Sequence, residues 1–172
     1  MQTSCYGMSV PLLSQFSVSS GTFTAFIAPV EDLTLAPGVY LRKETGLILY
    51  LCGNYPVILP EQDRFRDRFV VRRALTAYQI LTILDEAYQS FLIFEHDRTL
   101  FEDRADLLPI IGHRLREYAM KNSGVLLLAP YPDMYIQVLE PFFHRIFLIQ
   151  QTPVKPVPLK KRKLSKQLSL EV

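Results

Sequence analysis

Phe91-Leu92-Ile93-Phe94, followed at once by Glu95-His96-Asp97, is the stretch that decides the fold of this chain. The four apolar residues show no polar alternation, and a strand that is apolar on both sides is one covered on both faces, as in parallel sheets. Apolar residues recur with a helical period before it, from Ala77 to Ala87, and after it, from Leu108 to Tyr118. We therefore interpret the apolar run as a central strand of an α/β domain.

Further strands extend this pattern in both directions along the chain. Val125–Leu128 and Arg145–Ile149 follow helical segments, and Thr22–Ala28 is a strand near the start. Gly38–Arg42 and Leu47–Cys52 are predicted to pair as a β-hairpin around a short turn. Helices that alternate with strands imply right-handed parallel crossovers. The sequence thus predicts a three-layer α/β sandwich with a mostly parallel sheet and this N-terminal hairpin.

The composition predicts one domain and a tail. The chain has 172 residues, of which 49% are apolar and 21% charged, the ordinary balance of a globular domain. Residues 1–151 are expected to form a single domain, with 1–20 as an irregular arm. Residues 152–172 are expected to form a flexible, disordered basic tail, because prolines and a basic run remove the apolar density that a core needs. The tail carries a net charge of +5, which leaves −3 for the rest of a chain whose total is +2.

Several classes of protein are disfavoured by the sequence. The longest apolar runs are a few residues, whereas a membrane-spanning helix needs roughly 20. Met1–Ser4 lacks the basic region and apolar stretch of a secretory signal. Two cysteines are too few for a disulfide framework or a four-cysteine zinc site, and the three histidines show no metal-binding spacing. We expect no membrane association and a cytoplasmic location, or a nuclear one if the organism is eukaryotic.

Glu95, His96 and Asp97 are the candidate site residues of the body. They follow a buried strand, and ligand sites of α/β proteins lie outside the carboxyl ends of the strands. One interpretation is that Glu95 and Asp97 hold a divalent metal such as Mg²⁺, joined by His113 or Asp133. The other, which we favour, is that these polar residues begin a solvated loop in which Asp97 caps the next turn.

Basic residues of the tail are the candidate nucleic-acid contacts. Unopposed charges attract polyanions through counterion release, without reading the sequence of the nucleic acid. A nuclear-import address or a plain solubilising tail has the same composition. Arginines of the stretch 62–73 alternate with acids and are lesser candidates. The tail residues are Lys155, Lys160, Lys161, Arg162, Lys163 and Lys166, and the lesser ones are Arg64, Arg66 and Arg68.

Four segments between Leu47 and Pro130 together resemble a known family. They are the strand Leu47–Cys52, the helix entry Arg73–Leu81 (RALTAYQIL), the apolar strand Phe91–Glu95 and the strand Gly124–Leu128. Their order is similar to that of the ATPase core of the RecA/RadA recombinases, where the third segment takes the Walker B place and the fourth the sensor strand. The resemblance implies a RecA-like fold and a role in DNA recombination or repair.

The chain departs from that family where the chemistry would take place. A P-loop needs GxxxxGK[ST], because its glycines let backbone N–H groups surround the phosphates and its lysine neutralises them, yet no glycine of this chain precedes a lysine. The family's catalytic acid would fall at Gly53–Tyr55, which holds none, and Ala129-Pro130 replaces the polar sensor residue. The resemblance therefore implies a degenerate relative without a P-loop. We expect no cofactor, and Mg²⁺ only if a substrate phosphate completes its shell.

Three functional hypotheses follow from these features. The first is a non-catalytic RecA-like protein that associates with a protein partner or with copies of itself, and with nucleic acid through its tail. The second is a small metal- or nucleotide-binding α/β enzyme that uses Glu95 and Asp97. The third is a purely structural subunit of a larger assembly.

Overall fold

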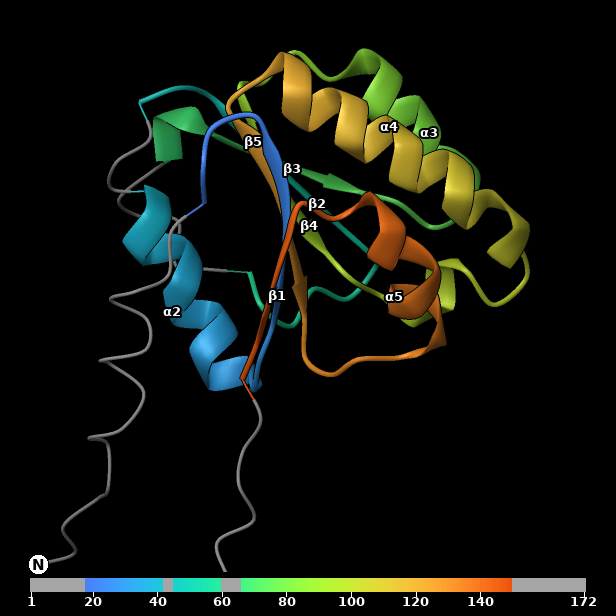
Figure 1. Cartoon of the computed structure of the whole chain (residues 1–172). Helices are drawn as coiled ribbons and strands as arrows, with labels where there is room; N and C mark the ends of the chain where they lie inside the picture. The colour runs from blue at the N-terminus through green and yellow to red at the C-terminus, as the bar shows by residue number, and fades with distance from the viewer. Residues whose placement is uncertain (1–17, 42–44, 60–65, 150–172) are drawn as a thin grey trace, which may run out of the picture.

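The computed structural model describes residues 18–41, 45–59 and 66–149, which contain one six-stranded sheet (Figure 1). The order of its strands is β3-β2-β4-β5-β1-β6, and each recorded strand pair is parallel. The elements, in chain order, are β1 (Thr22–Ile27), α2 (Val30–Leu41), β2 (Ile48–Cys52), η1 (Arg66–Arg68), β3 (Phe69–Arg73), α3 (Ala77–Glu86), β4 (Phe91–Glu95), η2 (Arg98–Leu100), η3 (Ala105–Leu107), α4 (Leu108–Lys121), β5 (Gly124–Ala129), α5 (Met134–Leu139), η4 (Glu140–Phe142) and β6 (Arg145–Leu148).

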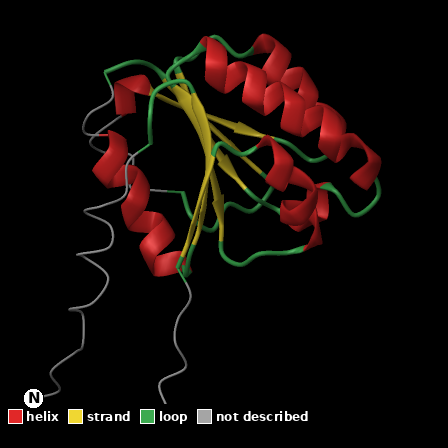
Figure 2. Ribbon diagram, viewed as in Figure 1, coloured by secondary structure: helices red, strands yellow, loops and turns green. Residues whose placement is uncertain are grey.

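Helices cover the sheet on both faces, which gives three layers (Figure 2). Helix α2 lies on one face, and α3, α4 and α5 lie on the other. Successive side chains of a strand point to opposite faces of the sheet, so the sheet packs against two separate hydrophobic cores, one on each face. In β4, for example, Leu92 and Phe94 belong to the core under α3 and α4, and Phe91 and Ile93 belong to the core under α2. The predicted three-layer α/β class is confirmed.

Strand β4 occupies the central place that its sequence predicts. All five of its residues are buried, and it is hydrogen-bonded to β2 on one side and to β5 on the other. Strands β1, β5 and β6 also form where the sequence predicts them. Among the described helices, none is long and apolar enough to cross a membrane.

The predicted N-terminal hairpin is wrong. Of its first strand, Gly38–Leu41 belongs to the last part of α2, and Arg42 lies outside the described residues. The second strand exists as β2, but its two partners, β3 and β4, run parallel to it. The physical reason is the connection: β1 and β2 are parallel, and a parallel connection needs a crossover, which α2 provides despite Pro37 and Gly38.

The charged stretch 62–73 contains a strand that its composition hides. Phe69–Arg73 forms β3, an edge of the sheet, and its last two residues, Arg72 and Arg73, are exposed. Arg72 is ion-paired with Glu86 of α3, at 2.9 Å. Arginines on an edge strand hinder pairing with another sheet, so the charges of this stretch fit an edge position.

Gly112 lies where α4 meets η4, and its replacement by alanine is expected to destabilise the protein. A Cβ at this position would lie 2.4 Å from Cδ2 of Phe142, so the helix or the ring must shift. Overpacking of this kind costs about 1–3 kcal/mol, more than the roughly 1 kcal/mol that alanine gains over glycine in a helix. Urea unfolding of Gly112→Ala measures the difference.

The control for Gly112→Ala is the same substitution in a Phe142→Leu background. Leucine removes the ring that the new methyl group would meet, so the cost of Gly112→Ala should shrink there. A Gly112→Ala protein more stable than the parent would contradict this prediction, because it would show that the Phe142 ring moves aside at little cost.

Candidate functional site

The carboxyl ends of β1 and β5 lie side by side at the point where the chain connections diverge. Strand β1 continues into α2 on one face of the sheet, and β5 continues into α5 on the opposite face. Ligands of open α/β sheets bind in the crevice outside the strand ends at such a switch point. This is the place where a functional site is expected on grounds of topology.

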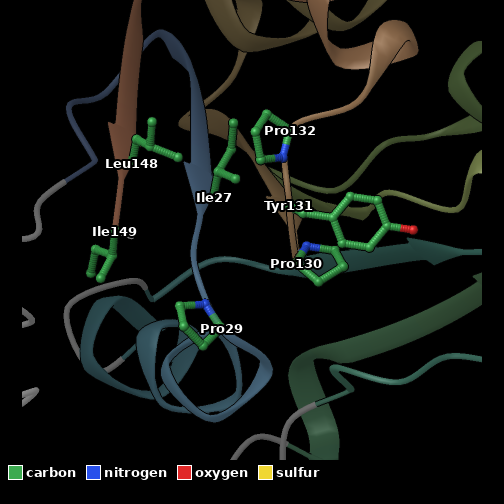
Figure 3. A pocket seen from close by; sticks show the side chains of 7 residues that line it. All are labelled: Ile27, Pro29, Pro130, Tyr131, Pro132, Leu148 and Ile149. Atoms are coloured by element: carbon green, nitrogen blue, oxygen red, sulfur yellow. The ribbon is translucent and has the colours of Figure 1, made fainter. Parts of the chain in front are cut away.

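A pocket of about 460 Å³ occupies this crevice (Figure 3). Most of its lining is apolar, and its one hydroxyl belongs to Tyr131, whose side chain is half exposed. The lining residues come from the ends of three strands and the loops that follow: Ile27, Pro29, Pro130, Tyr131, Pro132, Leu148 and Ile149. The sequence reasoning missed this pocket, although the segment Ala-Pro-Tyr-Pro after a buried strand marks one of its walls.

The turn from β1 into α2 lacks the features that bind phosphate. Only Ala28 and Pro29 separate the strand from the helix. Pro29 has no N–H to offer, and its carbonyl oxygen accepts from the N–H groups of Asp32 and Leu33, both at 3.0 Å. Glu31 and Asp32 bring two carboxylates into the first turn, which favours the helix through its dipole and repels an anion at the same place.

Glu95 ends β4 and is almost completely buried, at 4% exposure. Its Oε1 accepts hydrogen bonds from the backbone N–H groups of Val57, at 2.6 Å, and Ile58, at 3.2 Å. Its Oε2 accepts a hydrogen bond from the hydroxyl of Tyr50. The carboxylate therefore fastens the loop that follows β2 to the end of β4, and both of its oxygens are occupied by groups of the protein.

Burial and Glu95 together determine the state of two neighbouring side chains on β2. Burial first, and then the charge of Glu95, raises the pKa of the Tyr50 hydroxyl well above its usual range, so the hydroxyl stays protonated and donates. The same two causes raise the pKa of Cys52 to about 11. Because the thiolate is the nucleophilic form, Cys52 is held in its unreactive form at neutral pH.

His96 connects the end of β4 to the loop that follows β5. Its Nε2 lies 2.7 Å from Oδ2 of Asp133, and its ring stacks on Phe101 with the centroids 5.9 Å apart. A carboxylate only accepts hydrogen bonds, so Nε2 is the donor. Nδ1 of His96 is buried and has no hydrogen-bond partner in the part of the chain that the structure describes. Asp133 also caps α5, because its Oδ1 accepts from the N–H groups of Tyr135 and Ile136.

Asp97 caps the next turn, as the favoured interpretation of the sequence predicts. The solvated loop of that interpretation is wrong for Glu95 and His96, which are 4% and 8% exposed because both side chains bind neighbouring loops. Its Oδ1 accepts from the backbone N–H of Thr99, at 3.0 Å, and from its hydroxyl, at 2.7 Å. Its Oδ2 lies against Gly53: a Cβ on Gly53 would come within 2.0 Å of it. A side chain at position 53 would therefore displace the Asp97 carboxylate, because the residue after β2 approaches it closely.

Glu95, His96 and Asp97, at the end of β4 and just after it, thus bind three different segments of the chain. Asp133 does join His96, whereas His113 lies on α4, where its ring contacts Phe142. No group of three or more metal-ligating side chains is gathered in the described ranges, and the metal role of Glu95 and Asp97 stays a prediction.

The predicted nucleic-acid residues fall largely outside the described part of the chain. All six basic residues of the tail and Arg64 lie there. Arg66 and Arg68 form the short turn η1, just before the edge strand β3. Of the predicted arm, 1–20, residues 1–17 lie outside the described residues, and the whole predicted tail, 152–172, lies outside them too.

Known proteins similar to this chain include a curated relative and a solved structure. No family model matches the chain. A stretch of 83 residues is 42% identical to an uncharacterised protein of Archaeoglobus fulgidus, covering 48% of this chain and 41% of that protein. The chain thus spans less than half the length of this relative. The crystal structure of the RadB recombinase is similar over 84% of this chain and 81% of its own, with 13% identity and a TM-score of 0.48. The function has to be inferred from the residues of the chain itself.

Proposed function

We propose that this is a non-catalytic, RecA-like α/β protein that acts by association, with a protein partner and with nucleic acid, in DNA recombination or repair. The observation that carries the proposal is the turn Ala28-Pro29 at the switch point. A nucleotide would need backbone N–H groups and a cation there. The structure has instead a proline at this turn, two carboxylates in the first turn of α2 and a mostly apolar pocket.

The polar end of β4 supports the same proposal. A catalytic carboxylate has to reach the substrate or a metal ion, but the oxygens of Glu95 accept hydrogen bonds from Tyr50, Val57 and Ile58. These bonds give Glu95 a structural role that explains its burial without invoking chemistry.

Nucleotide titration tests the first half of the proposal. Calorimetry with ATP or GTP, each with Mg²⁺ or Mn²⁺, should show no binding to the full chain. Tight binding would overturn the proposal in favour of a nucleotide-binding enzyme that uses Glu95 and Asp97.

Retention of nucleic acid at low salt tests the second half. The full chain should bind DNA or RNA of any sequence. Replacing Lys160, Lys161, Arg162 and Lys163 by glutamine should make the salt dependence of log K shallower by about 3–4, because each phosphate contact contributes about 0.7–0.9 to the slope.

A control for the tail variant removes four positive charges from the body instead. Replacing Arg104, Arg114, Arg116 and Lys121 by glutamine lowers the net charge equally and should leave the salt slope nearly unchanged. Absence of retention by the parent chain at low salt, or equal effects of the two variants, would contradict a role for the tail.

A further inference from the structure

The two edges of the sheet differ in what they expose. Strand β3 ends in two exposed arginines, which hinder pairing with another strand. On β6 the only charged residue is Arg145, and two apolar side chains on one face are left half exposed, Ile146 at 44% and Leu148 at 49%. An apolar edge strand of this kind is a template for further pairing.

The backbone of β6 is oriented for pairing at these two residues. The N–H of Ile149 points inward and donates to the carbonyl of Ile27 on β1, at 2.8 Å. Because backbone groups of a strand alternate in direction, the N–H and C=O groups of Ile146 and Leu148 point away from β1. At this edge, Ile146 and Leu148 therefore offer both apolar side chains and backbone N–H and C=O groups that could bond to a further strand.

Apolar side chains are also exposed on α5, the helix that precedes β6 in the chain. Leu148 and Pro132 line one pocket, and Met134, two residues after Pro132, is 64% exposed. Val138, one turn further along α5, is 41% exposed. Met134 and Val138 offer further apolar side chains to a partner besides Ile146 and Leu148, and stable interfaces need such additions because they bury about 1,200–2,000 Å² in total.

Charge determines which strand fits this edge. Parallel pairing of two β6 strands would set Arg145 against Arg145. Antiparallel pairing places Arg145 beside the far end of the other β6, where Ile149 and Pro29 meet and α2 begins with the exposed Glu31. No ion pair of Arg145 or Glu31 is recorded within the described ranges, so both are available for this contact.

We infer that β6 pairs antiparallel with β6 of a second copy of this chain, joining two sheets across a twofold axis with an Arg145–Glu31 contact made twice. A twofold interface uses one surface on both copies, as this complementarity requires. The inference names the protein partner in the association proposed above and rests on that proposal.

Sedimentation equilibrium of the full chain over a wide concentration range tests the inference. The mass should rise from 19.8 kDa toward twice that value with concentration. Ile146→Lys/Leu148→Lys should weaken the dimer about tenfold or more, because like charges then face each other across the pair. Leu35→Lys/Leu75→Lys, at exposed apolar residues on α2 and before α3, is the matched control and should leave the dimer unchanged.

Charge exchange provides a second test that does not touch the strand's apolar residues. Arg145→Glu and Glu31→Arg should each weaken the dimer, and the double variant should restore it. A chain that is monomeric at every concentration, or a dimer indifferent to both sets of variants, would overturn the inference. If the chain is monomeric, retains nucleic acid and binds no nucleotide, only the dimer is overturned. If it binds nucleotide, the proposed function is overturned whether the chain is a monomer or a dimer.

Discussion

Replacement of Glu95 by alanine should lower the free energy of unfolding by about 3–5 kcal/mol. The substitution leaves the hydroxyl of Tyr50 and the N–H groups of Val57 and Ile58 without their acceptor. The Tyr50 hydroxyl and the Ile58 N–H are buried, and each buried donor left unpaired costs about 1–3 kcal/mol, more where its lost partner was charged. Urea unfolding followed by circular dichroism measures the change.

Two milder variants separate the contributions at Glu95. Tyr50→Phe leaves Oε2 of the buried Glu95 carboxylate without its donor and should cost about 1–3 kcal/mol. Glu95→Gln keeps one acceptor oxygen and should fall between Tyr50→Phe and Glu95→Ala. A Glu95→Ala protein as stable as the parent would contradict the structural role, because functional carboxylates held for chemistry are commonly neutral or costly to stability.

Replacement of Asp133 by alanine should cost about 2–4 kcal/mol, because this side chain makes two separate sets of contacts. Loss of the cap on α5 accounts for about 0.5–2 kcal/mol. Loss of the partner of the buried His96 ring accounts for about 1–3 kcal/mol more. Thermal or urea unfolding of the variant gives the sum.

Asp133→Ser resolves the two contributions. Serine retains one oxygen for the N–H groups of α5 and offers none to His96, so its cost should be roughly half that of alanine. In a His96→Phe background, Asp133→Ala should lose only the capping contribution. If Asp133→Ser were as costly as Asp133→Ala, the contact with His96 would carry the whole effect.

The sequence predicts those elements whose own apolar residues are spaced as in a buried strand or an amphipathic helix. The uninterrupted apolar run of β4 and the repeat beginning at Ala77 needed no knowledge of neighbours. Strand β3 was hidden because an edge strand between charges has no such pattern, and α2 was hidden because Pro37 and Gly38 are ordinarily helix breakers. There the requirement to connect two parallel strands overrides local preference.

The partners of the polar residues after β4 were predictable only in part. The cap formed by Asp97 is local, with Thr99 two residues away, and the sequence indicates it. The backbone donors to Glu95 lie 38 and 37 residues earlier, in the loop after β2, and the Tyr50 hydroxyl lies 45 residues earlier, on β2. The loop after β2 meets the end of β4 because these two strands are neighbours in the sheet. Residue spacing along the chain does not predict which strands become neighbours.

The position of β1 has a consequence for how the protein is made. It is the first described strand to leave the ribosome, yet its neighbours in the sheet are β5 and β6: Thr22 lies opposite Gly124, and Thr24 opposite Arg145. Long-range pairing of this kind slows folding, because closing a large loop costs conformational entropy before the strand contacts form. During synthesis, the apolar strand β1 therefore has no partner strand until β5 has been made. Over that interval its apolar surface is exposed, and chaperones bind such surfaces.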